Sequence, residues 1–113
     1  MPDADVEQAS DALIGAAFGS AGERCMAISV AVAVGNVADD LIKSITPKIN
    51  QIKVGPYNDK LSEMGPIVSK QALDRIKSLI SSGVDDGADL LVDGRDIKLQ
   101  GYENGYFIGP CLF

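Results

Sequence analysis

The sequence of 113 residues predicts an α/β fold, in which helices alternate with strands and pack on a sheet. Two observations support this prediction. Apolar residues recur at helical spacing in three segments, 6–17, 38–52 and 69–82. Runs of apolar and β-branched residues separate these segments, and the longest of them covers residues 28–34. At this length the chain is one domain at most.

The first predicted helix begins after Asp5, because Gln8 follows three positions later and the two form a capping-box pattern. Gly19 and Gly22 are expected to end this helix and to begin a turn. One stripe of the helix carries small or apolar side chains, which permit close packing: Val6, Ala9, Leu13, Ala16 and Ala17.

Residues 28–34 are apolar at nearly every position, so they are predicted to form a central strand that is covered on both faces. Apolar residues then keep helical spacing up to residue 52, with Pro47 inside the run. A proline there removes a backbone donor and clashes with the preceding turn. Two outcomes are open. Either the helix is kinked, or a second helix begins at Pro47 with Thr46 as its cap.

A loop is predicted over residues 55–65 and a third helix over about 69–82, which Gly83 ends as a C-cap glycine. The inward face of that helix is expected to consist of four aliphatic side chains: Leu73, Ile76, Leu79 and Ile80. Three short strands are predicted to follow, over 88–92, 97–99 and 106–108.

The composition excludes several classes of function. A net charge of −6 and scattered Lys and Arg residues argue against nucleic acid as a partner, because phosphate binding needs a basic face. No apolar run is long enough to span a membrane, so no membrane partner is expected. The chain contains no His, which excludes a Cys-His dyad and any His-containing zinc site, and no metal site is predicted. Cys25 and Cys111 suggest no disulfide framework, which fits a reducing compartment.

Cys25 stands in a glycine-flanked turn between the first helix and the strand at 28–34. The neighbouring Arg24 offers a positive charge that favours a thiolate and a fork that binds a carboxylate at two points. The alternative is an inert cysteine, because free Cys is among the most buried residue types. Arg24 has its own alternative, a surface ion pair with Glu23 or Asp11. The residues alone leave both alternatives open.

Four short motifs resemble, in this order, motifs of the aldehyde dehydrogenase superfamily. They are FGSAGERCMA at 18–27, GPIV at 65–68, SGVDDGADLL at 82–91 and GYFIGP at 105–110. The Arg-Cys-Met-Ala sequence in the first motif is similar to the CoA-acylating branch, the methylmalonate-semialdehyde dehydrogenases. Four motifs in order are more specific than any one of them. Glu23 departs from the pattern, because the family usually has Gln there.

The resemblance implies that Cys25 is the catalytic nucleophile, which attacks an aldehyde and carries a thioester after hydride transfer to NAD. In the CoA-acylating branch, coenzyme A then takes the acyl group. Arg24 is implied to bind the carboxylate of a small semialdehyde substrate, methylmalonate or malonate semialdehyde, which gives propionyl-CoA or acetyl-CoA. Arg75 falls where many members place a basic residue near the nicotinamide ribose, although a solvated helix face explains it equally well.

The resemblance further implies that residues 1–113 are a single partial catalytic domain, with helices packed on a mostly parallel sheet. The NAD-binding and oligomerisation domains are expected outside this chain, in an enzyme that is a homodimer or homotetramer, and the chain alone is predicted to be inactive. The compartment implied is the bacterial cytoplasm, or the mitochondrial matrix in a eukaryote. Two alternatives stay open: a hydrolytic aldehyde dehydrogenase that releases a free acid, and a non-catalytic α/β domain that binds a partner and buries Cys25.

Overall fold

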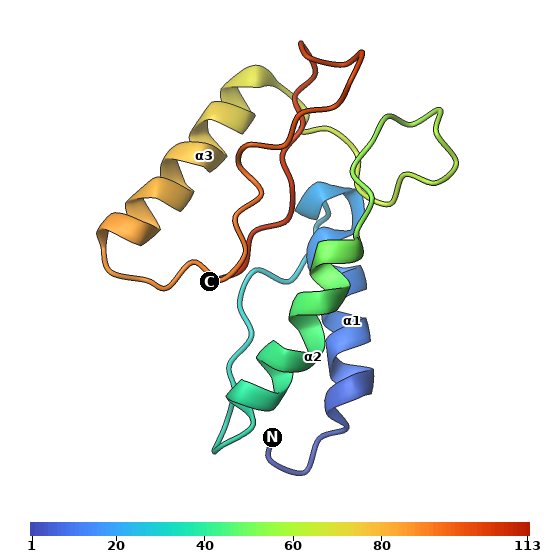
Figure 1. The fold of residues 1–113 in the computed structure, drawn as a ribbon. Coiled ribbons are helices and arrows are strands. Elements are labelled where there is room, and N and C mark those ends of the chain that lie inside the picture. The colour runs from blue at the N-terminus through green and yellow to red at the C-terminus, as the bar shows by residue number, and fades with distance from the viewer. The chain divides into compact units, whose positions relative to one another are not determined.

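The computed structural model describes residues 1–113, which form two compact units, residues 1–52 and residues 53–113 (Figure 1). The first unit contains α1 (Val6–Phe18) and α2 (Ala38–Gln51), and the second contains α3 (Lys70–Asp85). A short 3-10 helix, η1 (Gly19–Gly22), directly follows α1. None of the helices is both long enough and apolar enough to cross a membrane.

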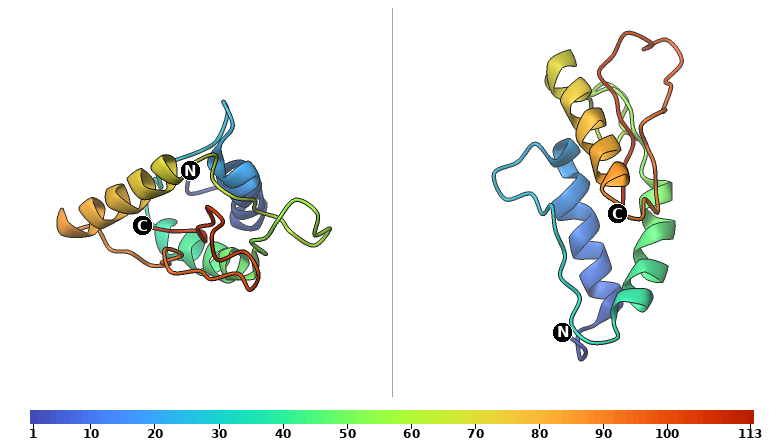
Figure 2. Two further views of the ribbon diagram at one scale, coloured as in Figure 1. Left: turned by 90° about the horizontal axis from the view of Figure 1, so that it is seen from above. Right: turned by 90° about the vertical axis from the view of Figure 1, so that its left-hand side faces the viewer.

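In the first unit, α1 and α2 lie side by side and run in the same direction, while the chain between them returns along the pair (Figures 1 and 2). The predicted start of α1 is confirmed, because Asp5 Oδ1 accepts the Gln8 N–H at 3.0 Å. The helix ends at Phe18, so Gly19 ends it as predicted. All five residues of the predicted inward stripe are half-buried.

A polar cluster joins α1 to α2, which the apolar pattern did not predict. Ser10 is completely buried, and its Oγ lies 2.9 Å from Ser44 Oγ and 2.8 Å from Lys48 Nζ. Lys48 Nζ also lies 2.5 Å from Asp11 Oδ1 and 2.6 Å from Glu7 Oε1. Hydrogen bonds to Asp11 and then Glu7 raise the pKa of Lys48, and the same ammonium lowers the pKa of Glu7. These contacts fix the register of the two helices.

α2 is one helix that continues through Pro47, so of the two outcomes left open, the second helix starting at Pro47 is excluded. Thr46, the expected cap, instead donates its hydroxyl to the Ile42 carbonyl at 2.7 Å. Ile45 and Ile49 flank the proline and are both buried. Burial of such side chains contributes about 2–3 kcal/mol each, which offsets the cost of a proline in a helix.

In the second unit, α3 begins at Lys70, within one residue of its predicted start, and Ser69 caps it by accepting the Ala72 N–H at 3.1 Å. The prediction that Gly83 ends this helix is wrong. The helix continues for two more residues, and Gly87 then adopts a φ of 93°. Gly87 N–H donates to the Val84 carbonyl at 2.9 Å, and the next residue donates to the Gly83 carbonyl at 3.0 Å. This is the Schellman arrangement, in which the left-handed glycine follows the last helical turn. Gly87, rather than Gly83, therefore ends α3.

The apolar core of the second unit includes two residues of the predicted inward face of α3, Leu73 and Ile80, while Ile76 is half-buried. The prediction for Leu79 is wrong, because its side chain is 60% exposed. Three further buried side chains come from the loops that pack on the helix: Met64, Ile67 and Ile108.

The predicted mostly parallel sheet is not formed within this chain. The only β pairings are two isolated bridges, a parallel one between Val54 and Met64 and an antiparallel one between Val92 and Leu112. Residues 28–34 form no bridge, and the side chains of Val30 and Val32 are 75% and 80% exposed. The predicted strands at 97–99 and 106–108 also form none. A strand needs a neighbour that supplies a ladder of N–H and C=O groups, and no segment of this chain supplies one.

Candidate active site

The predicted nucleophile stands at the corner of a tight turn in the first unit. Ala27 N–H donates to the Arg24 carbonyl at 3.1 Å, which leaves Cys25 and Met26 as the two corner residues. Both side chains are exposed. Neither corner N–H makes a hydrogen bond within the chain. The Cys25 sulfur is therefore accessible, beside a backbone N–H that is free to donate.

η1 reverses the chain between α1 and this corner. Ser20, Ala21 and Gly22 have positive φ values of 52°, 54° and 74° in succession. A left-handed conformation costs a residue with a Cβ about 1–2 kcal/mol, and two of these three residues have one. Contacts on either side of the reversal have to offset this cost.

Two contacts attach the corner to the last turn of α1. On one side, the Arg24 side chain donates through Nη2 to the Gly15 carbonyl. On the other side, Ile28 N–H donates to the Ala16 carbonyl at 3.2 Å. The carboxyl end of a helix carries the negative end of its dipole, which favours a cation there. The corner is thus held by an anchor before it and an anchor after it.

The Arg24 guanidinium fits against α1 because residue 19 is a glycine. A Cβ on Gly19 would lie 2.2 Å from Arg24 Nη2 and 2.8 Å from its Cζ. The backbone of Gly19, with φ −55° and ψ 132°, is open to any residue, so the site requires space rather than conformational freedom. The sequence pattern assigned Gly19 only to the end of the helix and gave no signal for this second role.

The other residues singled out from the sequence lie in the second unit. Arg75 is exposed on α3 and forms no ion pair, whereas the neighbouring Asp74 pairs with Lys70 at 2.5 Å. The Cys111 thiol is half-buried and accepts the Gly94 N–H at 3.2 Å. Burial raises the pKa of Cys111 above its ordinary value.

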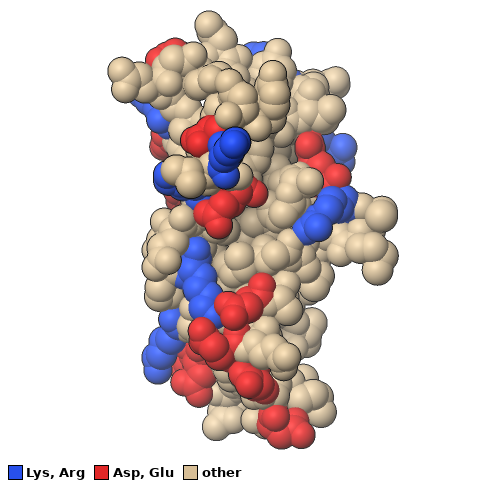
Figure 3. Space-filling model, turned by 90° about the vertical axis from the view of Figure 1, so that its right-hand side faces the viewer, with Lys and Arg blue, Asp and Glu red and all other residues tan.

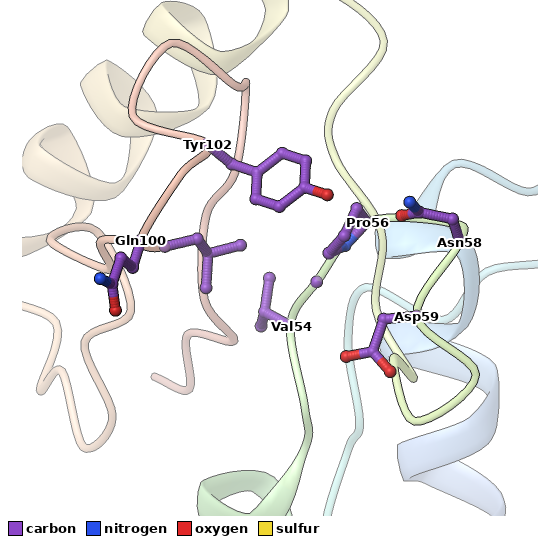
Figure 4. Close-up of a pocket in the computed structure, with 8 residues that line it drawn as sticks. Val54, Pro56, Asn58, Asp59, Gln100 and Tyr102 are labelled. Atoms are coloured by element: carbon purple, nitrogen blue, oxygen red, sulfur yellow. The ribbon is translucent and has the colours of Figure 1, made fainter.

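The second unit contains an open hollow of about 330 Å³ that sequence reasoning missed (Figure 4). Tyr102 faces it from one loop and Pro56 from the other, with Asp59 at its edge. The Asp59 carboxylate already accepts the Leu61 N–H at 2.9 Å. The lining contains no nucleophile, and no group of three His, Cys, Asp or Glu residues in the chain is arranged to hold a metal ion.

Positive and negative side chains are interspersed on the molecular face drawn in Figure 3, where Lys and Arg lie among Asp and Glu. The chain also contains ion pairs, among them those that join Lys48 to two carboxylates and Arg95 to Asp93.

Comparison with known proteins gives a consistent result over the whole chain. A model described as the aldehyde dehydrogenase family matches residues 1–113. The malonate-semialdehyde dehydrogenase of Pseudomonas aeruginosa is 52% identical over 114 residues, which are 100% of this chain and 23% of that protein. A mitochondrial methylmalonate-semialdehyde dehydrogenase [acylating] of Arabidopsis thaliana is 47% identical over 112 residues, 99% of this chain and 18% of that protein. The chain thus spans about a fifth of the length of these curated relatives.

A solved structure leads to the same family. A protein of Sinorhizobium meliloti 1021, solved in complex with NAD, is 62% identical and superposes with a TM-score of 0.96 over 98% of this chain and 23% of its own. This likeness is consistent with the predicted α/β class, although the chain itself forms only two isolated bridges. The family match covers every residue, including the turn that carries Cys25. The chain belongs to the aldehyde dehydrogenase family.

Proposed function

We propose that Cys25 is the nucleophile of an NAD-dependent, CoA-acylating dehydrogenase of malonate or methylmalonate semialdehyde. The observation that carries this proposal is the exposed thiol at the corner of a turn that is attached on both sides to α1. A sulfur fixed in this way can meet an aldehyde carbon repeatedly in one geometry. The names of the Pseudomonas and Arabidopsis relatives support the substrate class.

In this mechanism the Cys25 sulfur, as a thiolate, attacks the aldehyde carbon and forms a thiohemiacetal. The aldehyde oxygen becomes an oxyanion, and the unpaired Cys25 N–H is the donor that this chain can offer to it. Loss of a hydride to NAD⁺ leaves a thioester on Cys25, and the NAD complex of the Sinorhizobium protein supports this acceptor. The thiol of coenzyme A then takes the acyl group and returns the Cys25 thiol. For acetyl-CoA or propionyl-CoA to form, the bond between the substrate carboxylate and the neighbouring carbon also breaks, CO₂ leaves, and that carbon takes up a proton from water.

Arg24 is proposed to bind the carboxylate of the semialdehyde. Its contact with Gly15 uses Nη2, and the guanidinium has five N–H donors in all. The remaining donors can form the forked contact that carboxylates favour. This contact would orient a substrate that carries a carboxylate relative to the adjacent sulfur.

The residues of this chain do not form a site for NAD by themselves. Dinucleotide phosphates bind at helix N-termini that follow glycine-rich turns. The first turns of α1 and α2 instead carry acidic residues, Glu7 in one case and Asp39 and Asp40 in the other. The first turn of α3 carries none, but residues 64–69 before it contain a single glycine and form no glycine-rich turn. We therefore propose that NAD and coenzyme A are held mainly by other parts of a longer enzyme, with Arg75 near the nicotinamide ribose as the one contribution from α3.

The relatives' greater length supports this division, and the proposed enzyme is a homodimer or homotetramer whose cofactor and oligomerisation domains lie outside residues 1–113. Its proposed compartment is the bacterial cytoplasm, or the mitochondrial matrix in a eukaryote. A mitochondrial protein is among the relatives.

A chimera tests the proposal. Residues 1–113 replace the matching segment of the Pseudomonas malonate-semialdehyde dehydrogenase, and NADH and acyl-CoA are measured with malonate semialdehyde, NAD⁺ and coenzyme A. The expected result is turnover that Cys25→Ser abolishes and Cys111→Ser leaves in place. A free acid as product, with no acyl-CoA, would instead identify a hydrolytic aldehyde dehydrogenase. Undiminished turnover of the Cys25→Ser chimera would overturn the assignment of the nucleophile.

A further inference from the structure

Arg24 has a second role that its contacts with α1 reveal. We infer that Arg24 is a positioning residue for Cys25. Its guanidinium lies over Gly19 and donates to the Gly15 carbonyl, and this contact holds the turn that carries the thiol. This inference rests on the proposed function, because it supposes that Cys25 reacts. It adds a role for Arg24 toward every aldehyde, whether or not the aldehyde carries a carboxylate.

The corner is short enough for its two anchors to determine where the sulfur lies. Arg24 directly precedes Cys25, and Ile28 follows it by three residues. The anchors end on consecutive carbonyls of α1, those of Gly15 and Ala16. Loss of the first anchor leaves the corner held on one side only, next to a reversal in which two residues with side chains have positive φ. The corner can then rotate away from the helix end.

The arginine is suited to this contact in charge and in shape. The carboxyl end of a helix carries partial negative charge, so a cation is favoured there. The planar guanidinium lies so close to residue 19 that a Cβ there would reach Nη2 and Cζ. Gly19 is therefore part of the arrangement, although it touches neither the thiol nor a substrate in the proposed mechanism.

Gly19 gives a substitution that displaces Arg24 without removing it. Because the atoms in conflict belong to the far end of a flexible side chain, Gly19→Ala should be accommodated by movement of the guanidinium, and the fold should persist. Gly15→Ala is the matched control, since its Cβ meets nothing within 4 Å and its carbonyl is retained.

Hydrogen exchange on the 113-residue chain measures the anchoring directly. Arg24→Ala and Gly19→Ala should each accelerate exchange of the Ile28 N–H by about tenfold or more, because the second anchor frays when the first is lost. Gly15→Ala should leave that rate unchanged. Equal Ile28 exchange in the unmodified chain, Arg24→Ala and Gly19→Ala would overturn the inference regardless of any activity.

Turnover in the chimera separates positioning from substrate binding. With propanal, which has no carboxylate, Gly19→Ala and Arg24→Ala should each lower kcat by about tenfold or more with little change in KM, as expected for a misplaced reacting group. With malonate semialdehyde, Arg24→Ala should lose more than Gly19→Ala, because it also lacks the carboxylate fork. Arg24→Lys should recover part of the propanal kcat, since an ammonium can still donate to the Gly15 carbonyl.

The two proposals fail in different ways. Turnover that survives Cys25→Ser would overturn the proposed function. Turnover that requires Cys25 but gives the same propanal kcat for Arg24→Ala, Gly19→Ala and Gly15→Ala would leave the function in place and overturn the positioning role.

Discussion

The two cysteines of this chain lie in local structures of opposite kinds. Cys25 occupies the corner of a turn in the first unit, with its thiol exposed and its backbone N–H unpaired. Cys111 lies in the second unit on a segment that pairs with residues 91–94, and its half-buried sulfur accepts the Gly94 N–H at 3.2 Å. The same residue type is thus presented to solvent in one unit and used for packing in the other.

The glycines near the two cysteines also differ in which atoms an added Cβ would meet. Near Cys25, a Cβ on Gly19 would meet the end of the Arg24 side chain, which can move. Near Cys111, a Cβ on Gly94 would lie 2.2 Å from the backbone carbon of Gly109, which cannot move without breaking the Gly109 N–H to Gly94 carbonyl bond of 2.8 Å. The contact beside Cys25, the proposed nucleophile, therefore involves a side chain that can move, whereas the contact beside Cys111 involves backbone that cannot.

The largest expected effect is a difference in thiol reactivity. With iodoacetamide at neutral pH, Cys25 should be labelled at least about tenfold faster than Cys111, because the thiolate reacts and access is required. Burial raises the pKa of Cys111, so its labelling should increase only as the pH rises beyond its ordinary value of 9.0. Mass spectrometry of the peptides measures both rates. Equal labelling rates of Cys25 and Cys111 at neutral pH would contradict the distinction between an accessible thiol and a packed one.

The next expected effect concerns the 113-residue chain by itself. With malonate semialdehyde, NAD⁺ and coenzyme A it should produce no sustained NADH, because in the proposed mechanism NAD is held mainly by other parts of the enzyme and this chain supplies only the Cys25 N–H to the oxyanion. Loss of a single such donor typically costs about a hundredfold or more in rate. Absorbance at the NADH band measures this, with the chimera as positive control. Steady NADH production by the chain alone would show that its own residues suffice.

Local sequence signals predicted the helices well, since capping and apolar spacing act within a few residues. Asp5 caps α1 as expected, and α3 begins within one residue of its predicted start. Gly83 does not end α3, because Gly87 supplies the left-handed position one turn later. The sheet could not be predicted correctly in this way. Strand formation depends on a partner segment, and residues 28–34 find none within the chain.

In the candidate site, too, features set by neighbouring residues could be predicted, whereas contacts between residues far apart in the sequence could not. Its motif identified Cys25 and Arg24 as neighbours in a turn, which adjacency in the sequence guarantees. The anchoring of Arg24 to Gly15 spans nine residues across a reversal, and the polar cluster around Ser10 spans more than thirty. Neither contact leaves a periodic pattern, so both became visible only in three dimensions.

A smaller effect is expected in the free energy of unfolding when Gly94 or Gly19 is replaced by Ala. Gly94→Ala should lower the free energy of unfolding by about 1–3 kcal/mol, as expected when added volume forces the backbone to shift. Gly19→Ala should change it by less than about 0.5 kcal/mol, because a solvent-exposed side chain moves aside. Urea unfolding followed by circular dichroism measures both. A Gly19→Ala loss of unfolding free energy as large as that of Gly94→Ala would mean that the Arg24 side chain cannot move aside.

The smallest expected effect is a pH dependence confined to the first unit, where Lys48 holds α1 to α2. The Lys48 hydrogen bond lowers the pKa of Glu7 below its ordinary value of 4.5. The folded chain therefore binds a proton at Glu7 less readily than the unfolded chain. The stability that the Glu7–Lys48 pair contributes is present above about pH 4.5 and is lost as the pH falls through the lowered pKa.

Glu7→Gln should flatten the acid side of a stability-versus-pH curve. Lys48→Met should remove the same dependence, and in the Lys48→Met background Glu7→Gln should have little further effect. Because the pair is close to solvent, high salt should weaken the dependence in the unmodified chain. An acid limb that is unchanged by both substitutions would show that the α1–α2 contact does not depend on this ion pair.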